Sequence, residues 1–390
     1  MGPLFDKNVI NTGRQTEADC TKAVCIVTMI IVHVLEELGT FFPSPEVNES
    51  AVFYFFVVII DALFGASTFM FCMGFGIAFS GKNDGDSMIR RGIRLFFCAY
   101  LLNIARYGIP DLLNWLITGD STMCREDFPE LLLANDILQF AGLAFILFGF
   151  LKKRRISDTG LAVTALVMSA LGSIFRNFDL SELLHITGRI PYAVVNQLGG
   201  LFFGTIYSYD PEIDLTCFPL MNWFIFVTAG YLFGGVMRRC KDKGRFYRMA
   251  VPAGAAVVAV YLAFAVPKRL GMMNENTNML YHLTTPEALT GIISAVTFFG
   301  LFYGLSKILP NSFSVIASRI SRNLTTIYVF QWVLIECVLT GALTVMQLQG
   351  VSDEEWPAVS LPQIFLVAAV IFAVSMLAAE LIRKRKKNHK

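Results

Sequence analysis

Long apolar runs constrain this fold more than any other feature of the sequence. A helix rises about 1.5 Å per residue, so about 20 apolar residues are needed to cross a hydrocarbon core about 30 Å thick. The 390-residue chain is 55% hydrophobic and contains 35 Phe, and this apolar content is gathered in runs of that length. We therefore predict an all-α polytopic membrane protein with about ten transmembrane helices. The expected spans are 20–40, 51–79, 93–117, 131–151, 160–175, 219–237, 249–266, 284–308, 322–347 and 361–383.

Charged residues between the runs predict the orientation of the chain. Loops rich in Lys and Arg stay on the cytosolic side of a membrane. The basic positions are Lys82, Arg90, Arg91, Arg94, 152–155, 238–248, Arg319, Arg322 and 383–390. The loops at 40–50, 118–130, 207–218 and 348–360 are acidic or nearly free of basic residues. We expect both termini in the cytosol, with 1–19 as an N-terminal segment and 384–390 as a basic tail.

Residues 189–207 do not fit this alternation. The segment is apolar, but a further crossing there would place the basic loop at 238–248 outside. Its Pro and Gly residues favour a re-entrant or surface hairpin, which is tolerated where protein covers it. We see no soluble domain, so we expect one continuous transmembrane domain over 1–390.

Composition excludes other classes of function. A net charge of +2 gives no reason to expect a nucleic-acid partner. The eight Cys residues form no CxxC pattern, and no metal site is expected. Cys124 and Cys217 fall in expected outer loops and could form a disulfide. Residues 1–20 lack the pattern of a cleavable signal peptide.

The first apolar run carries ionisable residues that point to chemistry. Lys22 and His33 are eleven residues apart, which places them on nearly the same helix face. Glu36 and Glu37 follow His33 at i+3 and i+4, where helical side chains can touch. We predict that His33 acts as general base or transient acyl carrier, with Glu36 or Glu37 orienting its ring. A buried histidine packed between helices is the alternative.

Other polar residues lie within expected spans. Ionisable groups inside a bilayer need partners or a water-filled cavity. The set is Asp61, Arg106, Asn135, Asp136, Gln139, Gln331 and Glu336. We predict that they form a substrate-binding site opening outward. The alternative for Arg106 is an ion pair that holds helices together.

A basic cluster lies at the expected cytosolic end of the third span. Guanidinium groups bind phosphates through forked hydrogen bonds, so Arg90, Arg91 and Arg94, with Lys22, could hold an anionic cofactor. Anchoring of the span by its positive charges is the competing interpretation.

Several short patterns together resemble the acyltransferase-3 superfamily and its heparan-α-glucosaminide N-acetyltransferase-like relatives. Asp19-x-x-Lys22-x10-His33 resembles the family's D-x-x-R-x10-H opening. Further similar segments, in order, are FMFCMGFGIAFSG (69–81), RRGIRL (90–95), the D-x-L-Q-x-x-G pattern at 136–142, CFPLMNWFIFVTAGYLFG (217–234) and SRNLTTIYVFQWVLI (321–335).

The resemblance covers roughly 16–340 and implies transfer of an acyl group, usually acetyl from acetyl-CoA, to an extracytoplasmic carbohydrate. His33 would be the catalytic histidine, Lys22 would replace the family's Arg, and Arg90, Arg91 and Arg94 would be its basic motif. Lys22 keeps the charge but loses the forked geometry. Gln331 stands where relatives often have His.

These expectations place the protein in a bacterial cytoplasmic membrane, with lipid and an envelope glycan as partners. The acceptor and the oligomeric state stay open. A different class, a proton-coupled transporter or flippase, could use the same intramembrane His, Asp, Arg and Glu residues. No inverted repeat is evident in the sequence to support it. A non-catalytic membrane scaffold is the third possibility.

Overall fold

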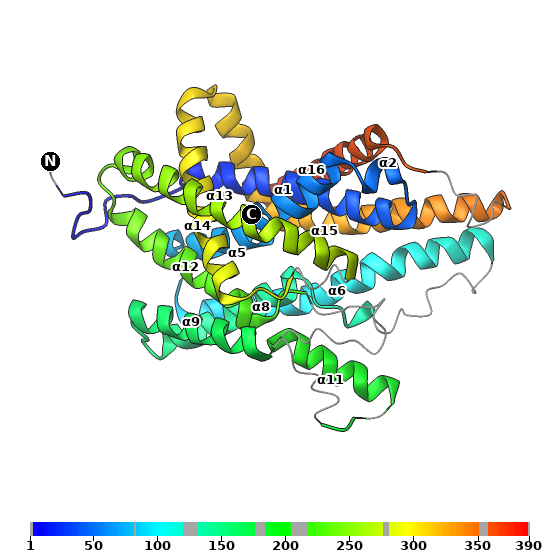
Figure 1. Ribbon diagram of the computed structural model, residues 1–390, viewed down its shortest axis with the longest axis horizontal. Helices are drawn as coiled ribbons and strands as arrows, with labels where there is room; N and C mark the ends of the chain where they lie inside the picture. The colour runs from blue at the N-terminus through cyan, green and yellow to red at the C-terminus, as the bar shows by residue number, and fades with distance from the viewer. Residues whose placement is uncertain are drawn as a thin grey trace. The chain divides into compact units, whose positions relative to one another are not determined.

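In the computed structural model, every named element of regular secondary structure among the described residues is a helix (Figure 1). These residues are 3–81, 83–119, 131–175, 184–186, 188–203, 217–275, 281–350 and 358–388. The helices are α1 (Thr16–Phe41), α2 (Pro45–Asn48), α3 (Ala51–Phe53), η1 (Tyr54–Ile60, a π-helix), α4 (Asp61–Phe64), α5 (Ala66–Phe79), α6 (Gly85–Thr118), α8 (Ile137–Lys153), α9 (Asp158–Phe175), α11 (Arg189–Phe202), α12 (Leu220–Arg239), α13 (Lys243–Glu275), α14 (Thr285–Ile308), α15 (Asn311–Leu348) and α16 (Leu361–Asn388). The prediction of an all-α protein is confirmed for this part of the chain.

Within the described ranges, seven helices are long and apolar enough to cross a membrane. They are α1, α9, α12, α13, α14, α15 and α16. The other three expected spans are helical but differ from simple crossings. Residues 51–79 divide into short helices that break at Gly65, and α5 has only 14 residues. Helix α6 carries charged residues and an internal Pro110, and α8 has 17 residues.

The expected hairpin at 189–207 is not a hairpin in its described part. Residues Arg189–Phe202 form one helix, α11. Pro191 lies in the first turn, where the missing N–H has no helical partner to lose. Gly199 and Gly200 continue the helix instead of turning it. Cys124, one half of the disulfide expected with Cys217, lies outside the described residues.

The chain forms two compact units. Unit 1 contains Met1–Thr21, Ala62–Tyr100 and Leu133–Asn311, and unit 2 contains Lys22–Asp61, Leu101–Leu132 and Ser312–Lys390. Helices α1 and α6 contribute residues to both. The single continuous domain expected from the sequence stays a prediction.

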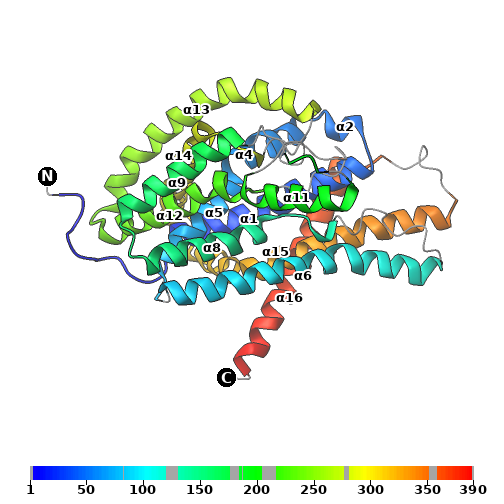
Figure 2. The ribbon, with the colours of Figure 1, turned by 90° about the horizontal axis from the view of Figure 1, so that it is seen from below.

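Unit 1 has its core around α5, α12 and α14, which pack against one another in both views (Figures 1 and 2). Phe71, Phe75 and Phe299 are buried there and meet through their rings, with centroids 5.0–5.5 Å apart. Glycines bring α5 and α12 together: a Cβ at Gly74 would lie 1.9 Å from the carbonyl oxygen of Val227. Small residues at helix contacts are the usual way that membrane helices approach closely.

The segment matching the Phe-Pro-x-x-x-Trp pattern fixes the turn before α14. The Trp223 indole N–H donates to the carbonyl of Tyr281 at 2.7 Å, and the Asn222 amide donates to the carbonyl of Leu283 at 2.7 Å. Thr284 then caps α14, with its side chain and that of Glu287 forming a capping box. In this chain the pattern has a structural role.

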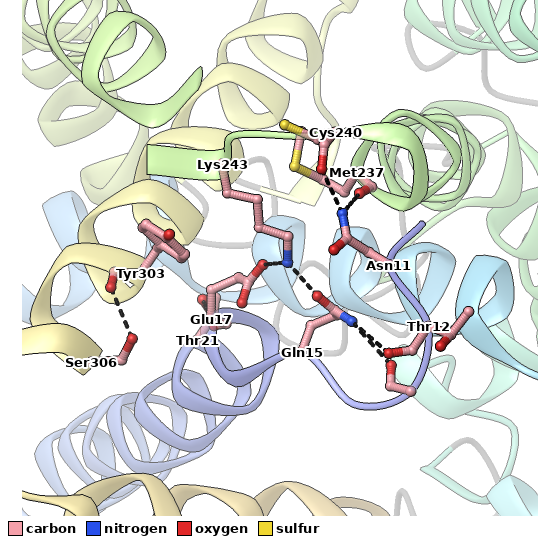
Figure 3. A network of polar contacts seen from close by, with 11 residues as sticks. Asn11, Thr12, Gln15, Glu17, Thr21, Met237, Cys240, Lys243, Tyr303 and Ser306 are labelled. Atoms are coloured by element: carbon pink, nitrogen blue, oxygen red, sulfur yellow. Dashed lines mark hydrogen bonds and ion pairs between the residues drawn. The ribbon is translucent and has the colours of Figure 1, made fainter. Parts of the chain in front are cut away.

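The N-terminal segment, residues 4–15, lies along the corner between α12 and α13 (Figure 3). Asn11 donates from its side-chain amide to the carbonyls of Met237 at 2.8 Å and Cys240 at 2.7 Å. These are carbonyls at the end of α12, where helix geometry leaves acceptors unsatisfied. Lys243, at the start of α13, contacts Gln15 and the buried carboxylate of Glu17. The segment therefore caps the C-terminal end of α12. The ion pair between Lys243 and Glu17 holds the chain in place directly after it.

Candidate active site

His33 of α1 is held in unit 2 by two consecutive residues of α15. Its ring stacks on that of Trp332, with centroids 4.2 Å apart and planes 24° from parallel. Its Nδ1 lies 3.2 Å from the amide nitrogen of Gln331. Gln331 is fully buried and Trp332 is 7% exposed. The imidazole is thus fixed by a ring contact and a hydrogen bond, and Nδ1 is the atom that is engaged.

Arg106 of α6 links α1 to α15 beside this histidine. Its Nε donates to Glu336 at 2.9 Å, and a terminal nitrogen donates to Glu37 at 3.1 Å. Its guanidinium carbon lies 3.5 Å from the centre of the Trp332 ring. Glu336 is only 1% exposed, so its charge depends on Arg106. The ion pair expected as the alternative role for Arg106 is present.

Helix periodicity explains how these groups meet. His33 and Glu37 are four residues apart on α1, and Trp332 and Glu336 are four residues apart on α15. Residues at i and i+4 share a helix face, one turn from each other. Each helix therefore presents a ring and, one turn further along, a carboxylate. Arg106 binds both carboxylates.

Two further carboxylates, those of Glu36 and Asp61, belong to the same unit. Glu36 interacts electrostatically with both Asp61 and Glu37. Asp61 begins α4, directly after the π-helical turns of η1, and such turns frequently occur at functional sites. His33, Glu36, Glu37, Asp61, Arg106, Gln331 and Glu336 are thus all in unit 2, as are their contacts described above.

A polar pair continues along α6 and α15 away from the ion pair. The Thr344 hydroxyl donates to the side-chain oxygen of Asn114 at 2.7 Å, and both residues are buried. Glu336, Thr340 and Thr344 follow at intervals of four residues, so they line one face of α15.

Three expected substrate residues belong to unit 1, at the start of α8. Asp136 is the N-cap, and its backbone N–H donates to the side-chain oxygen of Gln139 at 3.0 Å in a capping box. Gln139 also donates to the carbonyl of Ala134 at 3.0 Å, and Asn135 is 4% exposed. These contacts explain Asp136 and Gln139 by helix capping. Their role in binding substrate stays a prediction.

The expected donor-binding residues carry accessible charges. Arg90, Arg91 and Arg94 are exposed on α6 in unit 1. The Arg91 guanidinium lies 4.4 Å from the centre of the Phe145 ring, and Arg90 donates to the Ser87 hydroxyl at 3.3 Å. Lys22, in unit 2, is half-buried and forms no ion pair with a described residue. Arg90 interacts electrostatically with the Asp84 carboxylate, and no ion pair is formed by Lys22, Arg91 or Arg94 with a residue that the structure describes.

Trp332 contacts His33, yet the sequence patterns do not single it out from the other aromatic residues of its apolar span. Its position beside Gln331 and four residues before Glu336 is the signal that could have identified it. No cluster of three His, Cys, Asp or Glu side chains suited to a metal occurs among the described residues.

Comparison with protein families identifies a match over most of the chain. The acyltransferase-3 family profile, described as an acyltransferase domain, matches residues 16–380. No curated protein and no solved structure matches the chain. The match includes α1, α6 and α15, which supply His33, Arg106 and Trp332.

Proposed function

Because this chain belongs to the acyltransferase-3 family, we propose that it transfers an acetyl group from cytosolic acetyl-CoA to an extracytoplasmic carbohydrate of a bacterial envelope. The family and the apolar helices together indicate a membrane acyltransferase. The observation that carries the proposal is His33, held by Gln331 and Trp332 beside the Arg106 ion pairs.

His33 supplies the proton chemistry through Nε2, because Nδ1 is engaged by the side-chain amide of Gln331. Nε2 has its lone pair available when Nδ1 carries the hydrogen and donates to the amide oxygen. As a base, Nε2 takes the proton of an acceptor hydroxyl while the hydroxyl oxygen attacks the thioester carbonyl carbon. The C–S bond then breaks, and the departing thiolate takes the proton from the imidazolium. As a carrier, Nε2 attacks the thioester carbonyl carbon, the C–S bond breaks and the thiolate leaves. The acceptor oxygen then attacks the acyl carbon, the C–N bond breaks, and the acceptor's proton passes to the thiolate.

Basic and polar residues would bind the two substrates. Arg90, Arg91 and Arg94, which are exposed on α6, would neutralise the phosphates of the donor. Lys22, in unit 2, is proposed separately to contact the donor. Asp61 and the Arg106–Glu336 pair would line the acceptor side of His33. Asn135, Asp136 and Gln139, which belong to unit 1, are proposed separately to contact the acceptor.

The test is release of free thiol from acetyl-CoA by purified protein in lipid, with an envelope glycan fraction as acceptor. We expect acceptor-dependent release that is lost in His33→Ala. The matched control is His185→Ala, which removes an exposed histidine of unit 1 and should leave the rate unchanged. Release that survives His33→Ala would disprove the role of His33. No release with any acyl-CoA would disprove the proposed function.

The donor site has its own test. Arg90→Ala, Arg91→Ala and Arg94→Ala should each raise KM for acetyl-CoA about tenfold, because a hydrogen bond to a charged group contributes about 1.5 kcal/mol. The effect should shrink at high salt. Arg154→Ala, at the exposed end of α8, is the control. Equal KM values in all four variants would leave positive-inside anchoring as the role of the cluster.

A further inference from the structure

Two buried polar atoms beside His33 have no hydrogen-bond partner. They are Oε1 of Gln331 and the indole Nε1 of Trp332. Both residues contact the imidazole, one at hydrogen-bond distance and one by stacking. Both belong to unit 2, as His33 does.

Such atoms require an explanation. A buried polar group without a partner costs about 1–3 kcal/mol, and few occur in native proteins. Two of them adjoin the residue expected to react, on consecutive positions of α15. The Trp332 N–H can only donate, so it needs an acceptor atom that the described protein does not provide.

Gln331 can also present a donor. Rotation of its amide by 180° exchanges the oxygen and nitrogen, so Oε1 would accept from the Nδ1–H of His33. This orientation leaves the lone pair on Nε2, as both mechanisms above require. It also remains compatible with the imidazolium, in which both ring nitrogens donate. The amide N–H would then join the Trp332 N–H as an unpaired donor next to His33.

We propose that the Trp332 indole N–H and the Gln331 amide N–H bind the oxyanion formed when the donor's thioester is attacked. The inference rests on the proposed function and assigns a binding site within it. Attack on the carbonyl carbon by the acceptor oxygen, or by Nε2, moves the C=O π electrons onto oxygen. Two fixed donors stabilise this charge, and collapse of the intermediate returns the electrons and expels the thiolate.

Trp332→Phe is the most direct test. Phe keeps a ring for His33 to stack on and for the Arg106 guanidinium to cover, but it has no N–H. Loss of one oxyanion donor lowers kcat about 100- to 1,000-fold, with KM for both substrates unchanged. Trp115→Phe is the matched control, because Trp115 is an exposed residue of α6 in unit 2. Thermal unfolding in detergent should give similar midpoints for both variants.

Gln331 provides a second and independent test. Gln331→Glu keeps an oxygen for Nδ1–H but removes the N–H donor, so kcat should fall as it does in Trp332→Phe. The new carboxylate also favours the imidazolium, so the acid limb of the pH–rate profile should move to higher pH. Gln331→Leu should also lower kcat, but it should not move the acid limb of the pH–rate profile to higher pH.

The outcomes separate the two claims. A folded Trp332→Phe or Gln331→Glu variant with wild-type kcat would overturn the oxyanion assignment and leave the proposed function intact. A rise in KM at unchanged kcat would also overturn it, since the residues would then bind the ground state. A wild-type protein without thiol release would overturn the proposed function, and this assignment with it.

Discussion

The Arg106 side chain forms two ion pairs and a cation–π contact in unit 2. It binds Glu37 and the buried Glu336, and its guanidinium covers Trp332. A guanidinium suits this position because it can donate to two carboxylates while its flat face packs on a ring. The same residue therefore joins three helices and sets the surroundings of His33.

We expect Arg106→Leu to destabilise the protein strongly. Removing one partner of a buried ion pair costs about 3–5 kcal/mol, because the remaining charge is left without compensation. The double variant Arg106→Leu/Glu336→Leu should recover part of that loss, since the buried carboxylate is gone. Thermal unfolding in detergent measures both. A double variant no more stable than the single one would contradict this account.

Much of this site could be predicted at the residue scale. His33, Arg106 and Glu336 stand out because charge is costly inside a membrane. The partner of Nδ1 could not be predicted, because spacing along α1 favoured Glu36 or Glu37 and only the fold brings Gln331 to the ring. Trp332 could not be separated from other aromatic residues of apolar runs, since its importance lies in what it touches.

Among the elements, α5 and α12 show the tightest limits on side-chain size. A Cβ at Gly74 would lie 1.9 Å from the Val227 carbonyl oxygen, and one at Gly230 would lie 2.0 Å from that of Phe71. Both obstacles are backbone atoms, which cannot move aside as a flexible side chain could.

Gly230→Ala should therefore prevent tight packing of α5 and α12 and lower the unfolding temperature. Gly235→Ala, on the same helix, meets nothing within 4 Å. It should be neutral or slightly stabilising, by up to about 1 kcal/mol, because Ala favours a helix over Gly. Thermal unfolding of the pair checks this. Equal unfolding temperatures in the two variants would show that the close contact at Gly230 does not limit packing.

The N-terminal segment also has a pH-dependent contact. The Asn8 backbone amide and then Lys241 hold the pKa of Asp6 below its usual value. A lowered pKa means that Asp6 stabilises the segment at pH values above the unfolded-state pKa. This contribution is lost as pH falls through the folded-state pKa.

We expect Asp6→Asn, which mimics the protonated form, to loosen this segment at neutral pH. Hydrogen exchange should quicken at the amides of Asp6, Ile10 and Lys241, which donate to backbone carbonyls across the corner. Asp158→Asn, at the exposed start of α9, is the control. Unchanged exchange in Asp6→Asn would show that the backbone contacts suffice alone.

At the scale of the whole molecule, the described residues contain fewer candidate crossings than the sequence predicts. Seven described helices can span a membrane, whereas ten spans were expected. Hydropathy detects apolar content, but it does not reveal that 51–79 divides at Gly65 or that Asp136 and Gln139 cap α8. Helical class follows from composition, while breaks and caps depend on local hydrogen bonds.

The positive-inside argument predicts that both termini face the cytosol. A fluorescent reporter that matures only in the cytosol, fused after Lys390, should be bright in intact cells. The same reporter inserted after Glu46, in α2, should be dark, because 40–50 is expected outside. A dark C-terminal fusion at normal expression would contradict the topology.

The close glycine contacts between α5 and α12 also limit how these two helices can move against each other. Gly74 faces the backbone of α12, and Gly230 faces the backbone of α5. A screw movement of one residue, with a rotation of about 100° and a shift of about 1.5 Å, would bring Met73 or Phe75, or Ala229 or Tyr231, to a place where even a methyl group cannot fit. The two helices are therefore locked in axial register. Any shape change that accompanies turnover should leave this pair rigid, and strain should be released in other contacts of unit 1.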